Sequence, residues 1–210
     1  MKIAIVNKFL YRRDGVTAVV EETASLLRSA GHEVFFFGQD HCLKFTSGYC
    51  AETVEPLDLR EERPSLSKLA RIVLRFYLSV GALGPFENFL KKTEPDVVHF
   101  HNIYHHLGPY LIARAKNFSI PCVMTLHDYK LFCPSYNMLR TKKTRPVVCS
   151  QCIKKGPFEA VRYRCVRDST ALSLLCFFEA LLHKRLYSLI DPVSYTHLRA
   201  HETRHDLVCR

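Results

Sequence analysis

The fold class is decided by residues 94–134, EPDVVHFHNIYHHLGPYLIARAKNFSIPCVMTLHDYKLFCP. Two short apolar runs, Val97–Phe100 and Cys122–Leu126, flank a helical pattern at about Pro109–Asn117. Strand, helix and strand in this order, with polar residues at both strand exits, are typical of a parallel α/β sheet. Ligands bind such sheets at the carboxyl ends of the strands. The stretch therefore predicts an active-site edge.

The N-terminal residues predict another strand–helix–strand unit. Lys2–Val6 has the pattern of a buried strand, and Val16–Ala30 carries apolar residues at the spacing of an amphipathic helix. Gly31 supplies the helix stop before a second strand at Glu33–Phe37. Together the two units predict an α/β fold, a Rossmann-like parallel sheet with helices on both faces.

The segments between and after these units are less regular. Residues 39–64 are polar and are expected to form an irregular excursion from the sheet. A Cys-rich insertion is expected at about residues 133–165, followed by a helix at Ser169–Ile190. One domain is therefore predicted over residues 1–191.

Ser65–Val80 predicts a basic amphipathic helix. Its apolar stripe consists of Leu69, Ile72, Val73, Phe76 and Val80. The flanking basic residues are Lys68, Arg71 and Arg75. Two interpretations stay open. The helix either covers the sheet or makes a peripheral contact with an anionic membrane surface, here the inner face of the cell membrane.

Composition argues against several classes of protein. The chain has 210 residues, 48% of them hydrophobic, and a formal net charge of +10, which together indicate a globular protein suited to an anionic partner. The longest apolar run, Ala171–Leu182, is interrupted by Glu179 and falls short of the roughly 18 residues of a membrane span. Met1–Val6 lacks the long apolar core of a signal peptide. The nine cysteines therefore predict a cytoplasmic location, where thiols stay reduced.

The C-terminal residues differ in character from the rest. Residues 193–210, VSYTHLRAHETRHDLVCR, resemble the translated end of a transposon-based sequencing adapter, which encodes Val193–Thr203 in one frame and Asp206–Arg210 in the adjoining primer segment. We therefore expect the natural sequence to end near Asp191, with residues 192–210 an artefactual tail. The alternative is a natural basic tail.

A glycine follows the first predicted strand. Asp14–Gly15 lies where a glycine lets a ligand approach the backbone and where a helix N-terminus favours negative charge. The simpler interpretation is that Gly15 only makes the turn. The chain has no GxGxxG and no Walker lysine motif, which argues against a dinucleotide enzyme or a P-loop NTPase.

Histidines follow both strands of the opening stretch. His99 and His101 alternate along one strand and share a face, and Asn102 follows them. Either histidine would suit a ligand contact, although for His99 a hydrogen-bonded core position is favoured. His127 follows the second strand, where general acid–base catalysis or a hydrogen bond to a substrate hydroxyl would suit an imidazole. For Asp128 an N-cap or loop hydrogen bond is the simpler interpretation.

Four cysteines form the pattern C-x15-C-x2-C-x12-C, namely Cys133, Cys149, Cys152 and Cys165. The C-x2-C pair has the spacing that wraps a tetrahedral zinc, and two further thiolates would complete the site. Basic residues in the segment would offset the charge of four thiolates; they are Lys142, Lys143, Arg145, Lys154 and Lys155. The pattern predicts a structural zinc, and reduced, buried cysteines are the alternative.

Four segments of the chain together carry a resemblance to a known family. In chain order they are MKIAIVN with the following Gly15, AGHEVFFF, EPDVVHFHN and IPCVMTLHDYKLFCP. In this order they resemble the N-terminal domain of a family 4 glycosyltransferase of the GT-B type, from Met1 to about Pro134. The Cys-bearing segment and the helix that follows it resemble an insertion of some bacterial members.

The resemblance implies two Rossmann-like domains that face each other across a cleft, of which this chain is the acceptor-binding half. The other half binds the nucleotide-sugar donor. Transfer to a saccharide or lipid-linked acceptor retains the anomeric configuration and uses no catalytic metal.

By position, the resemblance makes His127 the catalytic residue, in contact with the reacting sugar. Gly15 would lie near the donor diphosphate, and His101 and Asn102 would line the acceptor side. Asp128 is counted with these substrate-binding residues. Many members have a Gly-Gly pair where this chain has Asp14–Gly15, and an acidic residue there would repel a diphosphate unless it is turned away.

The donor-binding domain would begin shortly after Ile190 and is absent, so we expect the chain alone to lack transferase activity. Two other functions remain open, a basic zinc-containing nucleic-acid-binding module and a membrane-associated interaction module. The basic residues are scattered and no recognised motif frames them, so no nucleic-acid partner is expected.

Overall fold

The computed structural model describes residues 1–39, 49–56, 65–142, 145–191 and 193–194. The chain divides into two units. Unit 1 comprises Met1–His127 together with the residues from Leu189 onward, and unit 2 comprises Asp128–Ser188.

Unit 1 is built on a parallel sheet with the strand order β3-β2-β1-β4-β5-β8. The strands are β1 (Lys2–Phe9), β2 (Glu33–Gln39), β3 (Tyr49–Val54), β4 (Val97–Phe100), β5 (Cys122–Thr125) and β8 (Val193–Ser194). Ile3 of β1 aligns with Val34 on one side and Val97 on the other, which makes β1 a central strand. The predicted Rossmann-like α/β class is confirmed.

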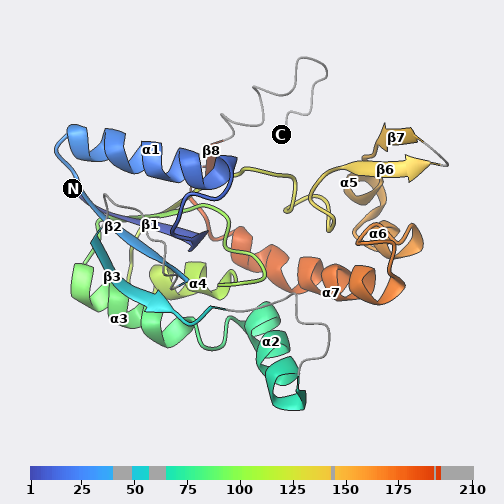
Figure 1. Ribbon diagram of the computed structural model, residues 1–210, viewed down its shortest axis with the longest axis horizontal. Helices are drawn as coiled ribbons and strands as arrows, with labels where there is room; N and C mark the ends of the chain where they lie inside the picture. The colour runs from blue at the N-terminus through green and yellow to red at the C-terminus, as the bar shows by residue number, and fades with distance from the viewer. Residues whose placement is uncertain (40–48, 57–64, 143–144, 192, 195–210) are drawn as a thin grey trace. The chain divides into compact units, whose positions relative to one another are not determined.

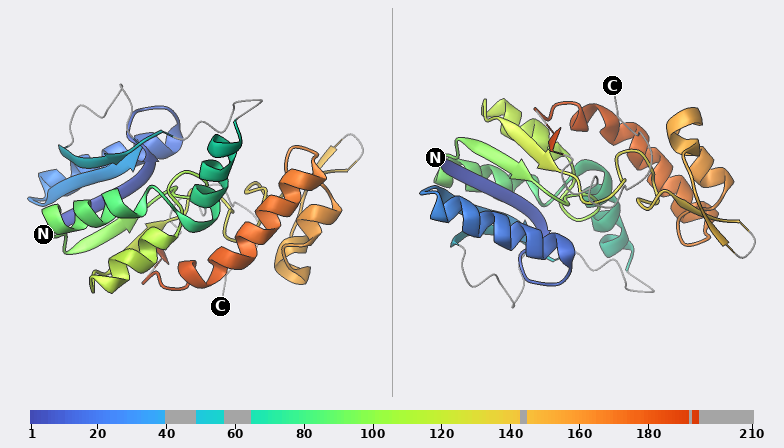
Figure 2. Two further views of the ribbon diagram at one scale, coloured as in Figure 1. Left: turned by 90° about the horizontal axis from the view of Figure 1, so that it is seen from below. Right: turned by 90° about the horizontal axis from the view of Figure 1, so that it is seen from above.

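Helices cover both faces of this sheet. The helices of unit 1 are α1 (Gly15–Ser29), α2 (Leu66–Leu78), α3 (Leu83–Thr93) and α4 (Tyr110–Asn117). Figure 1 shows α1 above the sheet and α3 and α4 below it, and the turned views of Figure 2 show the same layers. This arrangement follows from the connections β1-α1-β2 and β4-α4-β5, since parallel neighbours require a crossover.

Successive side chains of β1 point to opposite faces of the sheet, so β1 contributes to the core on both faces. Ile3 and Ile5 pack with Val20 and Ala24 of α1, and all four side chains are buried. Ala4 lies between the two isoleucines and is also fully buried. Because side chains alternate along a strand, a central strand covered on both faces is apolar at every position.

The face below the sheet holds a buried aromatic cluster. It consists of Phe37, Phe86, Phe89 and Phe100, all fully buried. The ring centroid of Phe37 lies 4.9 Å from that of Phe86 and 5.3 Å from that of Phe89, both tilted. Tilted pairs contribute about 0.5–1.5 kcal/mol beyond their buried area. The cluster therefore joins β2 and β4 to α3.

Two aspartates fix the starts of neighbouring strands. The carboxylate of Asp96 accepts a hydrogen bond from the N–H of Lys2 at 2.7 Å, and the N–H of Asp96 donates back to the Lys2 carbonyl at 2.8 Å. Asp191 makes the same pair of bonds with Cys122, both at 2.8 Å, and forms an ion pair with Lys116. Asp191 thus directs the chain into β8 beside β5, as Asp96 directs it into β4 beside β1.

The irregular excursion predicted for residues 39–64 is wrong in part. Tyr49–Val54 forms the strand β3, which pairs with β2 at the edge of the sheet. An edge strand has a neighbour on one side only, so its sequence carries a weaker apolar signal than a central strand. Residues 40–48 and 57–64 lie outside the described residues.

The predicted helix at Ser65–Val80 is confirmed as α2, with the Ser65 hydroxyl accepting the first-turn N–H of Lys68 at 3.3 Å. Of the three basic residues that flank its apolar stripe, Arg75 is buried. Arg75 is 3% exposed, and its guanidinium donates to the carbonyl of Glu55 at 2.6 Å and to that of Val80 at 3.3 Å. Backbone carbonyls therefore hold this cation inside unit 1.

Unit 2 begins with a loop and an antiparallel hairpin of β6 (Leu139–Lys142) and β7 (Arg145–Val148). Three helices follow, α5 (Gln151–Lys155), α6 (Glu159–Arg162) and α7 (Thr170–Tyr187). The helix predicted at Ser169–Ile190 is confirmed as α7, with Ser169 as its N-cap. The hairpin and the two short helices are not foreseen from the sequence, and the expected Cys-rich segment lies within this unit.

Among the described residues, no single helix is long and apolar enough to cross a membrane. Ser67–Leu78 and Leu83–Thr93 pass that test only together, bent by 52°. Of the segment that resembles an adapter, Val193–Ser194 forms β8, and residues 195–210 lie outside the described residues.

Gly38 offers a test of the packing between β2 and the chain that leaves β1. A Cβ atom on Gly38 would lie 2.2 Å from the Asn7 carbonyl oxygen and 2.8 Å from Leu10 Cγ, so the backbone would have to move. We expect Gly38→Ala to lower the free energy of unfolding by about 1–3 kcal/mol. Urea unfolding followed by circular dichroism measures this change.

Gly84→Ala is the matched control, because a Cβ atom there meets nothing within 4 Å. Alanine at this helical position should be neutral or stabilising by up to about 1 kcal/mol. Equal stability of the Gly38 variant and the unsubstituted chain would contradict the close packing.

Candidate active-site edge

The carboxyl ends of β1 and β4 are held together by a buried amide. The side chain of Asn7 is fully buried, and its Oδ1 accepts the backbone N–H of Asn102 at 3.2 Å. Its Nδ2 donates to the Phe9 carbonyl at 2.8 Å, and the N–H of Lys8 donates to the Asn102 carbonyl at 2.9 Å. A buried amide without partners would cost about 1–3 kcal/mol. These bonds therefore fix the backbone on which the edge is built.

Three histidines converge beside this amide. His101 Nδ1 lies 2.8 Å from His127 Nε2, so that one nitrogen donates and the other accepts. The ring centroids of His99 and His101 lie 4.3 Å apart, and His99 Nε2 lies 2.8 Å from Thr125 Oγ1. The prediction that His99 and His101 share a face is confirmed, as is the hydrogen-bonded position of His99.

Burial keeps His99 and His101 neutral. Desolvation lowers the pKa of His99 to about 4. It also holds the pKa of the fully buried His101 well below 6.5, with smaller effects from His99 and His127. At neutral pH these imidazoles therefore act through hydrogen bonds and not through charge. Within the described part of the chain His101 Nε2 is buried without a hydrogen-bond partner, an unfavourable arrangement of the kind that functional sites retain.

Cations and aromatic rings gather at the carboxyl end of β1 and in the loops after β1 and β4. Lys8 Nζ lies 4.3 Å from the centroid of the Tyr104 ring, and the Arg13 guanidinium lies 4.4 Å from that of Phe9. His106 contacts Phe9 edge-on at 5.3 Å. Burial, and then the charge of Lys8, lowers the pKa of His106 to about 3. The edge therefore presents positive charge next to neutral imidazoles, which favours an anionic ligand.

The first helix begins at the same edge, because the loop after β1 leads directly into α1. Asp14 is the N-cap of α1, and its Oδ1 accepts the N–H of Thr17 at 3.0 Å. The Thr17 hydroxyl in turn accepts the N–H of Asp14 at 2.9 Å. The carboxylate of Asp14 is thus turned toward its own helix. A Cβ atom on Gly15 would meet nothing within 4 Å, so the glycine leaves open space beside the backbone.

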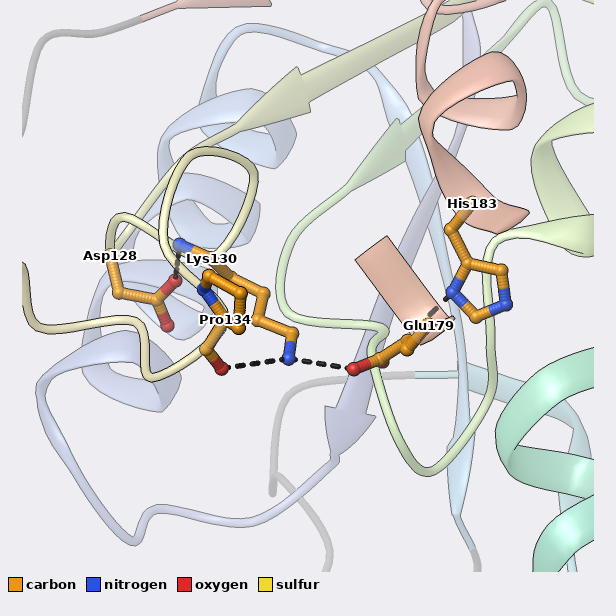
Figure 3. A network of polar contacts seen from close by, with 5 residues as sticks. All are labelled: Asp128, Lys130, Pro134, Glu179 and His183. Carbon is orange, nitrogen blue, oxygen red and sulfur yellow. Dashed lines mark hydrogen bonds and ion pairs between the residues drawn. The ribbon is translucent and has the colours of Figure 1, made fainter. Parts of the chain in front are cut away.

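Unit 2 contains a buried charged network, drawn in Figure 3. Lys130 Nζ lies 2.7 Å from Glu179 Oε2 and 3.2 Å from the Pro134 carbonyl oxygen, and His183 Nδ1 lies 3.9 Å from Glu179 Oε1. The side chains of Lys130 and Glu179 are only 7% and 2% exposed. Asp128 Oδ1 accepts the N–H of Lys130 at 2.9 Å, which is the loop hydrogen bond expected for Asp128.

The ion pair joins the loop after Asp128 to the middle of α7. Removing one partner of a buried pair typically lowers stability by about 3–5 kcal/mol, since it leaves a charge without compensation. The network therefore constrains the start of unit 2.

The four cysteines of the predicted zinc site all lie in unit 2. They are Cys133, Cys149, Cys152 and Cys165, and all are free thiols. Cys133 Sγ accepts a hydrogen bond from the Cys152 thiol and lies 3.2 Å from Ser135 Oγ. Thiolates are the side-chain ligands that suit a soft metal ion.

The family model of Glycosyltransferase Family 4 matches residues 13–152, which is two thirds of the chain. The chain belongs to glycosyltransferase family 4. The resemblance drawn from the sequence is therefore confirmed. No curated protein matches the chain significantly.

Similar solved structures include the three that follow. MurG of Acinetobacter baumannii is 11% identical, with a TM-score of 0.41 over 61% of this chain and 35% of that one. Sucrose-phosphate synthase of Thermosynechococcus elongatus is 14% identical, with a TM-score of 0.38 over 62% and 34%. The glycosyltransferase VinC, solved in complex with dTDP, is 17% identical, with a TM-score of 0.36 over 60% and 34%. At these TM-scores none of these structures is used to support the family assignment. The chain spans about a third of the length of each of them.

In this family 4 chain, three of the predicted residues come together, namely His101, Asn102 and His127. Gly15 begins α1 at the same edge, whereas Asp128 belongs to unit 2.

Sequence reasoning missed Asn7, Lys8, Arg13 and His106. A signal was present for the first two, because both follow an apolar strand directly, as His101 and His127 do.

The family 4 chain should lose stability as the pH falls from 6.5 toward 4. The unfolded chain binds protons on His99 and His101 near their ordinary pKa of 6.5, whereas the folded chain binds them only at lower pH, so protonation favours unfolding in this window. Each histidine contributes at most about 1.4 kcal/mol per pH unit. Thermal unfolding across this range measures the slope. His99→Asn should flatten it, and an unchanged slope would show that His99 titrates alike in both states.

Proposed function

We propose that this chain is the acceptor-binding half of a retaining glycosyltransferase. The enzyme moves a sugar from a nucleotide-sugar to a saccharide or lipid-linked acceptor and uses no catalytic metal. The observation that carries the proposal is the hydrogen-bonded pair of His101 and His127 at the carboxyl-end edge of the sheet in a family 4 chain. Open parallel sheets bind their ligands at this edge.

His127 is the catalytic residue in this proposal. Its Nε2 is engaged by His101, which sets the orientation of the ring. An imidazole held in this way suits a hydrogen bond to a hydroxyl of the reacting sugar. Because burial keeps His101 neutral, it orients His127 without placing its own charge beside the reacting centre.

The acceptor lies against His101, Asn102 and the basic loop after β1. The backbone of Asn102 is fixed by Asn7 and Lys8, which holds its side-chain amide at a defined position. The positive charges of Lys8 and Arg13 would complement a phosphate. This complementarity favours a lipid-linked phosphate acceptor over an uncharged saccharide.

The donor diphosphate lies near Gly15, where the open space beside the backbone would admit it. The carboxylate of Asp14, turned to Thr17, is directed into the helix cap rather than outward. We place the remainder of the nucleotide-sugar in a second domain, and so the chain alone should bind acceptor without transferring sugar.

Acceptor binding tests this assignment. We expect the purified chain to bind a short-chain polyprenyl-phosphate saccharide and to produce no transfer product with a panel of nucleotide-sugars. His127→Ala should weaken that binding about tenfold, which corresponds to the loss of one or two hydrogen bonds. Isothermal titration calorimetry measures the affinity, and product analysis by mass spectrometry measures transfer.

His32→Ala is the matched control, because His32 precedes β2 at the opposite end of the sheet. Sugar transfer by the purified chain would refute the proposal that transfer requires a second, donor-binding domain. Equal effects of the His127 and His32 substitutions would refute the site.

We also propose peripheral membrane contact through α2, which would place the protein on the inner face of the cell membrane. Four apolar side chains of this helix are 40–46% exposed, namely Leu69, Val73, Leu74 and Leu78. Arg71 of the same helix is 60% exposed at its side chain and lies beside them in sequence. An exposed apolar surface edged with positive charge suits an anionic lipid surface.

Vesicle flotation tests the membrane contact. We expect the chain to float with phosphatidylglycerol vesicles at low salt and much less with phosphatidylcholine vesicles. Leu74→Glu with Leu78→Glu should lower the bound fraction at least about tenfold, because it removes apolar burial and adds like charge. Leu26→Glu is the control, since Leu26 is 64% exposed on α1. Equal loss in both variants would contradict a role specific to α2.

A further inference from the structure

Unit 2 has little apolar core of its own. It comprises about sixty residues, and its buried apolar side chains within the described part are Cys133, Pro134, Met138, Ala160 and Cys176. Large apolar side chains of α7 remain 40–54% exposed, among them Leu174, Phe178, Leu181 and Leu182. Units of this size that lack a core usually depend on disulfides or a metal.

The fold of unit 2 brings its four patterned cysteines into one region. Cys133 comes from the loop before the hairpin, Cys149 from the residue after β7, Cys152 from the first turn of α5, and Cys165 from the turn after α6. The Cys152 thiol donates a hydrogen bond to Cys133 Sγ, and Cys149 and Cys165 lie close enough to Cys152 to interact with it electrostatically. Sequence positions far apart therefore converge without any disulfide among them.

The backbone around Cys133 is arranged to hold a thiolate. The amides of Ser135 and Met138 donate to its sulfur, and the Ser135 hydroxyl lies 3.2 Å away. The Met138 carbonyl accepts the N–H of Cys149 at 2.7 Å, which ties the two cysteine-bearing segments together. Hydrogen bonds of this kind orient metal-bound thiolates.

Positive charge surrounds the cysteines. Arg140 acts on Cys165 and lies 4.2 Å over the ring of Tyr163. Lys154 and Lys155 occupy the exposed side of α5 next to Cys152. Four thiolates around Zn²⁺ leave two net negative charges, which these cations would offset.

We propose that Cys133, Cys149, Cys152 and Cys165 bind one structural Zn²⁺ that stabilises unit 2. Zinc takes the place of the thiol protons, which pass to solvent, and no oxidation is involved. No three of the four sulfur atoms, all in the described part of the chain, lie within 4.8 Å of one another, whereas Zn–S bonds of about 2.3 Å would place them about 3.8 Å apart. Cys149 and Cys165 are half-buried and lie outside the helices and strands, so zinc binding requires their side chains to reorient toward Cys133 and Cys152.

Metal analysis of the full chain, purified under reducing conditions with zinc in the growth medium, tests the proposal. We expect about one zinc per chain. Cys149→Ser with Cys152→Ser should lower the content at least about tenfold. Cys176→Ala, in a buried cysteine of the same unit outside the pattern, should leave it unchanged. Absence of zinc, or full retention in the double variant, would overturn the proposal.

Cobalt substitution of the unsubstituted chain tests the zinc site even if the double variant fails to fold. Replacement of zinc by Co²⁺ in the unsubstituted chain should give the thiolate charge-transfer band and the intense visible bands of tetrahedral cobalt. Chelation should then increase proteolysis within residues 128–188. A weak octahedral cobalt spectrum, or a Cys133–Cys152 disulfide found by mass spectrometry of the native chain, would contradict a four-thiolate zinc site.

Discussion

The edge of the sheet depends on the buried side chain of Asn7. Where β1 and β4 stop pairing, this one amide accepts from Asn102 and donates to Phe9. The backbone that carries His101 and Asn102 is therefore fixed by hydrogen bonds that water cannot replace, because Asn7 is fully buried. A hydrogen bond between His101, which follows β4, and His127, which follows β5, in turn orients the His127 ring. An apolar residue in place of Asn7 would leave the Asn102 amide unsatisfied and the edge undefined.

This edge of the sheet combines buried, neutral imidazoles with positively charged side chains. His99 and His101 are neutral because burial removes the water that would solvate an imidazolium. Lys8 and Arg13 bring positive charge to the same edge, where each lies over an aromatic ring. A sugar hydroxyl suits the first environment and a phosphate suits the second, which agrees with the donor and acceptor chemistry proposed for this family 4 chain.

The sequence predicted those parts of the fold whose pattern is local. Val97–Phe100 is predicted and observed with identical bounds, because a strand buried on both faces is a continuous apolar run. The strand at Tyr49–Val54 and the helix at Leu83–Thr93 were missed, since neither stands out as an apolar run. In the site, His101, Asn102 and His127 were predicted because they follow apolar runs, whereas Asn7 and Lys8 were missed although they follow one too. The pair of Lys130 and Glu179 was not predicted, because partners 49 positions apart leave no spacing to recognise.

The central claim is that the carboxyl-end edge of the sheet binds the acceptor. The most direct test is NMR of the chain with isotope-labelled histidines, titrated with a short-chain polyprenyl-phosphate saccharide. The imidazole resonances of His101 and His127 should shift together and saturate, while those of His32 stay in place. Saturating shifts confined to His32 or to histidines of unit 2, with the pair at the strand ends unmoved, would contradict the claim.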